Sequence, residues 1–199
     1  MIDKIRSLSK DTLIYGVNTI IGRFLNFLLV PYYTNKFLPE EYGVIALIYS
    51  YIALFNVFFS LGLESGYMRF ASLKETGTER ENFSNPYIVN AVNSLFLGLL
   101  LFSFSGGLAV ILQIDAKYSY LLKYAAAILV LDSVSLIPFA SLRLANKAGR
   151  FVTFKVTNIV INVILNIVLI SYYDMGIEAV LISNLISFRC LSMPGVLSF

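Results

Sequence analysis

Long apolar segments alternate with short polar breaks along the whole chain. The pattern contains these candidate membrane spans, of which the last is short: Thr12–Tyr33, Tyr42–Leu63, Tyr87–Ile111, Tyr120–Leu142, Phe151–Tyr173 and Ile177–Phe188. A helix needs about 20 largely apolar residues to cross the roughly 30 Å of hydrocarbon in a bilayer. Lipid offers no hydrogen-bond partner to an open backbone, so each span should be an α-helix. The pattern therefore predicts an all-α integral membrane protein with about six transmembrane helices.

The two ends of the chain need separate interpretation. The first apolar segment follows basic residues, as a cleaved leader would, but it is too long for one and contains Arg23. We therefore expect a retained first span. Near the other end, Arg189 and Pro194 interrupt the sixth apolar segment early. We expect residues 1–188 to form a six-helix transmembrane lobe, and residues 189–199 to be an atypical tail, truncated or frame-shifted.

Basic residues gather at alternate breaks. One set of breaks, together with the N-terminus, carries ten of them: Lys4, Arg6, Lys10, Arg69, Lys74, Arg80, Arg143, Lys147, Arg150 and Lys155. The other set carries three: Lys36, Lys117 and Lys123. Because Lys and Arg accumulate in the cytoplasmic loops of membrane proteins, this asymmetry places the N-terminus in the cytoplasm. We expect a multi-pass protein of the cytoplasmic membrane.

Composition agrees with this class of protein and disfavours several others. Of the residues, 58% are hydrophobic and 14% are charged, whereas soluble domains have about 45–50% apolar and about 25% charged residues. One cysteine, Cys190, and no histidine exclude an internal disulfide and disfavour a zinc site or histidine-based hydrolysis. A net charge of +3, spread over several breaks, does not favour nucleic acid as a partner. We expect no cofactor.

The first span carries a polar stripe. At 100° per residue, Asn18, Arg23 and Asn26 fall on one side of the helix, and bulky apolar residues fill the other. An arginine at the centre of a span costs about 2.5–3.5 kcal/mol on insertion scales, so Arg23 should face protein or water. Arg23 is therefore a candidate functional residue, and a structural ion pair or snorkelling is the alternative.

Further spans repeat this pattern. The second has Asn56 and Glu64 on one face, with Tyr49 and Ser60; the third has Asn90, Asn93 and Ser94; the fifth has Lys155, Asn158, Asn162 and Asn166. Asparagines at such spacing either hydrogen-bond a neighbouring helix or line a cavity. Asp132, the one mid-span carboxylate, has three alternatives: pairing with Arg23, binding a proton or cation, or a satisfied buried ion pair. Polar faces on several helices favour a wet cavity, as a channel or transporter needs.

Several motifs in order carry a family resemblance. They are Leu13-Ile-Tyr-Gly, Arg23-Phe-Leu-Asn-Phe, Pro31-Tyr-Tyr-Thr, Leu38-Pro-Glu-Glu-Tyr-Gly and Ser60-Leu-Gly-Leu-Glu-Ser-Gly-Tyr-Met-Arg-Phe. Over about residues 5–185, the chain resembles polysaccharide-biosynthesis flippases of the multidrug/oligosaccharidyl-lipid/polysaccharide exporter superfamily, which move O-antigen or capsule repeat units. The resemblance implies two six-helix lobes, of which this chain is the N-terminal one. It also implies the cargo, an oligosaccharide on a polyprenyl pyrophosphate that is flipped outwards by alternating access.

The resemblance assigns roles to the polar residues. Arg23 matches the cationic position of the first helix, and Arg69 matches the arginine after the second helix, where it would capture the head group. The candidate cavity residues are Asn18, Arg23, Asn26, Asn56, Glu64, Arg69, Asp132, Asn158 and Asn162. The expected partners are the bilayer, the lipid-linked oligosaccharide, a glycan polymerase and other glycan-assembly proteins.

Alternative functions remain. A cation-coupled drug or metabolite exporter of the same superfamily would usually carry a carboxylate in the first helix, where this chain has Arg23, although Asp132 keeps that alternative open. A non-transporting membrane component or a gene remnant is a further hypothesis. An enzyme of polyprenol-linked sugar transfer is disfavoured, because the loops hold no clustered acidic pair for a metal or a base.

Overall fold

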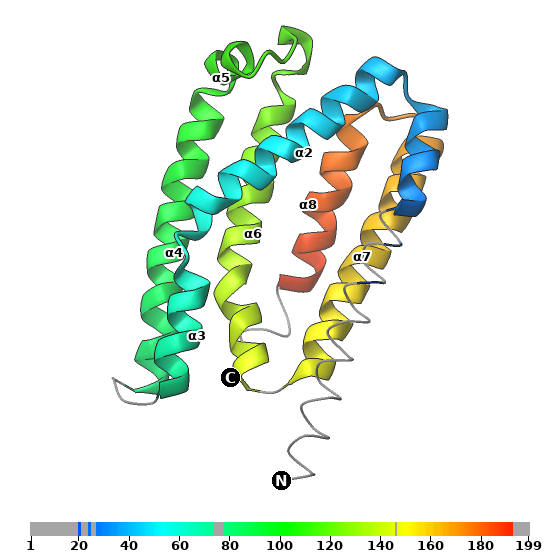
Figure 1. The fold of residues 1–199 in the computed structure, drawn as a ribbon. Helices are drawn as coiled ribbons and strands as arrows, with labels where there is room; N and C mark the ends of the chain where they lie inside the picture. Colours follow the sequence, from blue (N-terminus) through cyan, green and yellow to red (C-terminus); the bar gives the residue numbers. More distant parts are fainter. Residues whose placement is uncertain (1–19, 21–23, 25–26, 74–77, 146, 193–199) are drawn as a thin grey trace.

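Helices form all the regular structure in the described part of the chain. The computed structural model describes residues 20, 24, 27–73, 78–145 and 147–192. After a helix at 27–36, the elements are α2 (Pro39–Ser60), α3 (Leu63–Leu73), α4 (Glu79–Ser103), α5 (Ser105–Ile111), the 3-10 helix η1 (Ala116–Tyr118), α6 (Leu121–Leu144), α7 (Ala148–Ser171) and α8 (Glu178–Ser192), as Figure 1 shows. No strand occurs within these described ranges. The prediction of an all-α protein is confirmed.

Within the described residues, four helices are long and apolar enough to cross a membrane: α2, α4, α6 and α7. The sixth predicted span corresponds to the shorter apolar helix α8. Most of the first predicted span, Thr12–Tyr33, lies outside the described residues, and the helix at 27–36 covers its end. The chain is therefore a multi-pass membrane protein, and the predicted count of six spans is approximate.

The observed helix ends differ from the ends of the predicted spans where a polar cap or a break in the chain determines where the helix begins or ends. α4 begins at Glu79 rather than Tyr87, because Thr78 and Glu81 form a capping box at its start. It ends at Ser103 rather than Ile111, and the short α5 follows the break at Phe104. α8 continues past the predicted end, Phe188.

The second predicted span, Tyr42–Leu63, corresponds to α2, and a separate helix, α3, follows it after a break. α2 ends at Ser60, and the backbone of Leu61 and Gly62 turns into the left-handed region, with φ of 48° and 65°. Gly62 adopts this conformation without steric cost. The expectation that Asn56, Ser60 and Glu64 share one continuous helical face is wrong, because this break separates Glu64 from the other two.

Side chains from other helices satisfy the carbonyls at the end of α2. Asn93 of α4 donates Nδ2–H to the Phe59 carbonyl at 3.2 Å, and Ser133 of α6 donates its hydroxyl to the same oxygen at 2.9 Å. The last carbonyls of a helix have no partner within that helix, and lipid offers none. These two polar side chains therefore make a helix break possible in an apolar setting.

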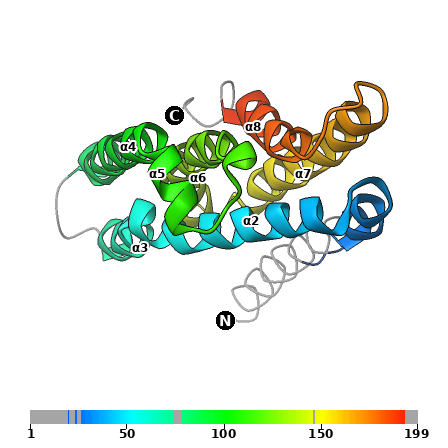
Figure 2. The same cartoon turned by 90° about the horizontal axis from the view of Figure 1, so that it is seen from above.

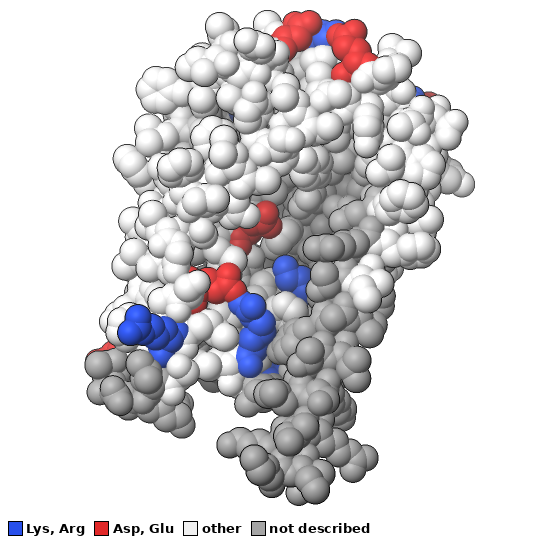
Figure 3. Space-filling model, viewed as in Figure 1, with Lys and Arg blue, Asp and Glu red and all other residues white. Residues whose placement is uncertain are grey.

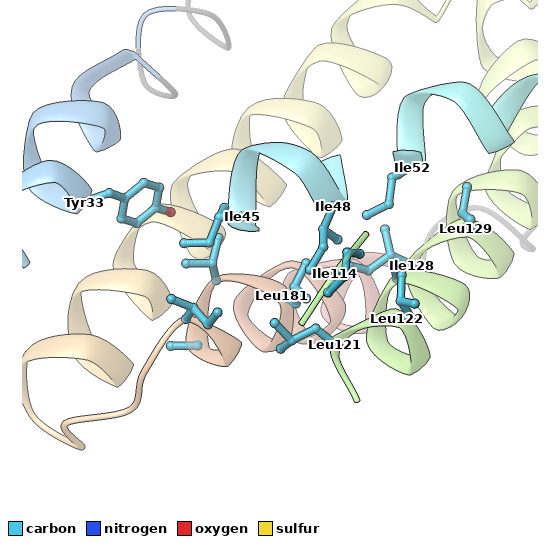
Figure 4. Close-up of a cluster of buried hydrophobic side chains, with 14 of the residues drawn as sticks. Tyr33, Ile45, Ile48, Ile52, Ile114, Leu121, Leu122, Ile128, Leu129 and Leu181 are labelled. Atoms are coloured by element: carbon cyan, nitrogen blue, oxygen red, sulfur yellow. The ribbon is translucent and has the colours of Figure 1, made fainter. Parts of the chain in front are cut away.

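α6 is the central helix. It packs against α2, α3, α4, α5, α7 and α8, and the view from above shows it enclosed by them (Figure 2). In the most apolar 18-residue stretch of α6, 50% is buried, whereas the buried share of the corresponding stretch is 22% or less in α2, α4 and α7. Leu121 and Leu129 of α6 meet Ile48 and Ile52 of α2 and Leu181 of α8 in the main core (Figure 4).

α4 shows how the sequence divides between lipid and protein. Asn90, Ser94 and Gly98 recur every four residues and are buried, while Val92 and Phe96 on another face are more than 60% exposed. Small and polar residues let helices approach and hydrogen-bond in a membrane, where lipid already solvates apolar side chains. The helix therefore turns its polar stripe inward and its apolar stripe outward.

The two ends of the bundle carry different charges. Arg69, Arg80 and Arg150 lie towards the end at which α3, α4, α6 and α7 connect, which is the lower end in Figure 1. At the other end, Lys117 contacts Glu40 at 3.1 Å and Asp115 at 3.8 Å. The hydrogen bond with Glu40 raises the pKa of Lys117 above its ordinary value. Arginines gathered at one end of the bundle are the pattern on which the preference of Lys and Arg for cytoplasmic loops relies.

Candidate functional site on helices α3, α6 and α7

Four charged side chains from three helices form what we call the charged cluster: Glu64, Asp132, Arg143 and Lys155. Glu64 lies in the first turn of α3, just after the break that ends α2. Its carboxylate forms an ion pair with Arg143 of α6, and both side chains are 34% exposed. Figure 3 shows acidic and basic side chains meeting in the lower half of this face, among uncharged ones.

Asp132 and Lys155 form the second half of the charged cluster. Asp132 lies on α6 and Lys155 on α7, and the charge of each acts on the other. Neither side chain is in a salt bridge within the described part of the chain, so the two charges attract across a gap. Tyr49 of α2 is also close enough to Asp132 to interact with it electrostatically, and its hydroxyl accepts a hydrogen bond from Asn184 at 3.3 Å.

Two phenyl rings support the cations. The Lys155 ammonium lies 4.7 Å from the ring centre of Phe139, and the Arg143 guanidinium lies 5.9 Å from that of Phe151. The two rings meet edge to face, with centres 5.7 Å apart. A cation over an aromatic face gains about 0.5–2 kcal/mol, more where water is excluded. The contact between the two rings therefore helps to hold the two cations near each other on α6 and α7.

The four charged side chains of the cluster satisfy one another only in part. Burying a charge is costly, and an intramembrane charge normally pairs with another or lines a polar pathway. Here Glu64 and Arg143 satisfy each other only in part, because the buried Nε of Arg143 has no hydrogen-bond partner. Asp132 and Lys155 are not in direct contact. The arrangement offers two cations to a phosphate and two carboxylates to a cation, on a face that is partly open.

The structure joins some of the predicted site residues and separates others. Glu64 and Asp132 both belong to the charged cluster. Asn56 lies on α2, Asn158 and Asn162 lie on α7, and Arg69 is exposed on α3; in the part of the chain that the structure describes, none of the four is hydrogen-bonded or ion-paired to the cluster. Asn18, Arg23 and Asn26 lie outside the described residues. The proposed roles of all these residues stay predictions.

Sequence reasoning missed Arg143 and the two phenylalanines. Arg143 falls near the end of a span and was assigned to a cytoplasmic break, yet it lies inside α6. The signal was present in the spacing: Asp132, Phe139 and Arg143 stand at positions i, i+7 and i+11, which fall on one helical face. A stripe drawn through Asp132 would have found Phe139 and Arg143, whereas Phe151 lies on α7, four residues before Lys155.

Several buried asparagines act as links between helices. Asn90 Nδ2 donates to the Ser133 carbonyl at 2.6 Å, so α4 is tied to α6. The Ser133 hydroxyl, which donates to Phe59, also lies 3.2 Å from Asn90 Oδ1. Asn166 is fully buried, and its Oδ1 accepts the Tyr33 hydroxyl at 2.8 Å, which ties α7 to the helix at 27–36. The contacts of Asn90 and Asn166 therefore support a role in linking helices rather than in lining a cavity.

Metal binding finds no support in the described ranges, which contain no group of three or more His, Cys, Asp or Glu side chains placed to hold an ion. Neither the curated proteins nor the solved structures contain a match to this chain. A protein family described as "Polysaccharide biosynthesis protein" matches residues 37–197, which include every helix from α2 to α8 and all four members of the charged cluster. This match covers most of the 199 residues. The chain belongs to the polysaccharide biosynthesis protein family.

Proposed function

We propose that this chain is the N-terminal lobe of a transporter that flips a polyprenyl-pyrophosphate-linked oligosaccharide across the cytoplasmic membrane. The observation that carries the proposal is the charged cluster, with two cations held on a partly open face of a membrane-embedded bundle. Membership of the polysaccharide biosynthesis protein family supports a glycan as the cargo. The bilayer and the glycan-assembly proteins, such as a polymerase, are its partners in this proposal.

The chemistry of the cargo fits these residues. A pyrophosphate loses its hydration when it leaves water, and cations near its path compensate that loss. The planar fork of arginine binds phosphate oxygens in pairs, whereas lysine supplies a compact point charge. In this proposal Arg69 meets the head group at the cytoplasmic edge, and Arg23, Arg143 and Lys155 accompany it further. The amides of Asn56 and Asn158 replace water on sugar hydroxyls.

The cycle follows from the same arrangement. A six-helix lobe that rocks against a second lobe would expose the charged cluster to each side of the membrane in turn. The ion pair between Glu64 and Arg143 would hold Arg143 while the site is empty. Binding of a phosphate would compete with Glu64 for the guanidinium, so cargo and carboxylate would alternate on one cation.

Cation removal tests the proposal in cells that depend on this gene for a surface glycan. Lys155→Gln and Arg23→Ala should each abolish the surface glycan and leave lipid-linked oligosaccharide in the inner leaflet, with unchanged protein level. Arg23→Lys should retain part of the activity if charge matters more than bidentate geometry. The matched control is Lys123→Gln, a lysine at the other end that also lies over a phenyl ring. A normal surface glycan in both Lys155→Gln and Arg23→Ala would overturn the proposal.

A cation-coupled exporter of small molecules is the second candidate, and Asp132 favours it. A carboxylate in a membrane helix with no direct ion-pair partner within the described chain is a natural site for a proton or a cation. Asp132→Asn separates the two candidates. It would abolish drug or metabolite efflux in the second candidate, whereas glycan flipping with normal surface glycan would persist if Asp132 only positions Lys155.

A further inference from the structure

A pocket lies between α3 and α4, away from the charged cluster. It has a volume of about 220 Å³. Leu63, Gly66, Tyr67 and Phe70 of α3 form one wall, at spacings that place them on one helical face. Glu81, Asn82, Asn85 and Pro86 of α4 form the other wall, again on one face. Pockets for drug-sized ligands measure about 300–1,000 Å³, so this one suits a single ring.

The two walls differ in chemistry. The α3 wall is apolar and aromatic, and the ring of Phe70 is 55% exposed. The α4 wall offers two amides and one carboxylate, and the lining residues within the described part of the chain include no lysine or arginine. An aromatic wall opposite a polar wall suits a pyranose. Its C–H face packs on an aromatic ring, while its hydroxyls form hydrogen bonds with amides and carboxylates. The carboxylate of Glu81 in the lining would repel a phosphate, which argues against an anionic ligand.

The polar wall combines one fixed carboxylate with two amides that are available to a ligand. The Oε2 atom of Glu81 accepts the backbone N–H of Thr78 at 2.9 Å, which fixes this carboxylate at the start of α4. The amides of Asn82 and Asn85 make no side-chain hydrogen bond within the described part of the chain. On the other wall, Tyr67 is 7% exposed and packs edge to face on Phe83, with ring centres 6.3 Å apart. Both walls are thus set without a ligand.

We infer that this pocket binds one neutral sugar unit, between the Phe70 side of α3 and the amides of α4. The site goes beyond the proposed function, since it shares no residue with the charged cluster and requires no transport. It would hold part of a glycan at the end of the bundle where α3 and α4 connect. The polar groups at Glu81 and Asn82 stand nearest to that end, and the apolar Leu63 lies at the other end of α3.

The absence of tryptophan from the sequence allows a direct test. Phe70→Trp keeps the aromatic platform and places one tryptophan at the pocket. The full chain in phosphatidylcholine vesicles, free of sugar detergents, is titrated with methyl glucoside, methyl galactoside and methyl N-acetylglucosaminide while its emission is followed. A saturable change with at least one glycoside is expected. Phe58→Trp, on an exposed apolar position of α2, is the matched control and should not respond.

Two further changes in the Phe70→Trp background make the test specific. Gly66→Leu should abolish the response, because a side chain at Gly66 enters open space within the pocket. The double change Asn82→Ala and Asn85→Ala should weaken binding about tenfold, since each lost hydrogen bond costs a factor of a few. Gly43→Leu, at a helical glycine that is equally open, should leave binding unchanged.

The inference would be overturned if no glycoside of the panel produced a saturable change. It would also be overturned if Gly66→Leu and the double alanine variant responded as the Phe70→Trp parent does. A response of equal size to glycerol 3-phosphate would also overturn it, because the Glu81 carboxylate of the pocket would repel a phosphate. Surface glycan in cells with Gly66→Leu reports separately on transport, so loss of sugar binding and failure of the proposed flipping are distinguishable.

Discussion

Tyr33 and Asn166 lie 133 positions apart in the chain and meet inside the bundle, where the Tyr33 hydroxyl donates to Asn166 Oδ1 at 2.8 Å. Asn166 is fully buried, and Tyr33 is 8% exposed. The contact joins the helix at 27–36 to α7. Nearby, the Tyr32 hydroxyl lies 2.7 Å from the Ser171 hydroxyl, so two tyrosines in succession connect the same pair of helices. The first helix is thereby fixed to α7 at one end by polar contacts.

Removal of the Tyr33 hydroxyl should destabilise this junction. Hydrogen bonds between membrane helices contribute about 0.6 kcal/mol on average and up to about 1.7 kcal/mol. We expect Tyr33→Phe to lower the free energy of unfolding by about 1 kcal/mol, measured by denaturant titration in mixed micelles. In a double-mutant cycle, Asn166→Leu should abolish the effect of Tyr33→Phe. Tyr42→Phe is the control, and an equal loss there would contradict the assignment.

The fold was largely predictable from the sequence because lipid imposes strong rules. Apolar segments of sufficient length must be helices, and charged breaks must lie between them. Helix ends were less predictable, since polar residues such as Thr78 and Glu81 extend a helix beyond its apolar part. The break at Leu61 and Gly62 was hidden within an apolar run, and the side chains that stabilise it come from α4 and α6.

The candidate site was predictable only in part. Glu64 and Asp132 stand out in the sequence because carboxylates are rare in apolar segments. Their partners depend on which helix faces which, and one sequence does not contain that information. Arg143 pairs with Glu64 only because α3 packs on α6 after the break, and Lys155 approaches Asp132 only because α7 lies beside α6.

Gly98 should be intolerant of any side chain. A Cβ atom at this position would meet the Cγ2 atom of Val130 on α6, and valine has a stiff side chain. Overpacking costs about 1–3 kcal/mol, so Gly98→Ala should destabilise the α4–α6 contact by that amount. Val130→Ala should restore stability in the double variant. Gly43→Ala, which meets nothing, should be neutral or stabilising, and an equal loss at Gly43 would show that helix packing is not the cause.

A charge swap should identify the ion pair between Glu64 and Arg143. Both side chains are a third exposed, so solvent screening limits the pair to about 1 kcal/mol. Glu64→Arg and Arg143→Glu should each lower thermal stability in detergent, because each creates a like-charge contact. The double swap should recover part of the loss, but not all, since Phe151 then faces a carboxylate instead of a guanidinium. Additive losses would show that the two side chains do not interact in the membrane protein.

Labelling of single cysteines should show which end of the bundle faces the cytoplasm. Cys190 is the one native cysteine, so Cys190→Ser provides a cysteine-free background. In that background we introduce Lys117→Cys at one end and Arg150→Cys, at an exposed position of α7, at the other.

Because basic residues accumulate at the end that carries Arg150, the rule for cytoplasmic Lys and Arg predicts that this end stays inside the cell. A membrane-impermeant maleimide should therefore label residue 117 in intact cells, and residue 150 only after permeabilisation. The reverse pattern would invert the orientation, and Arg69 would then lie on the outer side, where it could not be the first residue to meet a cargo made in the cytoplasm. Labelling of both positions from outside would contradict the alternation of breaks on which the span count depends.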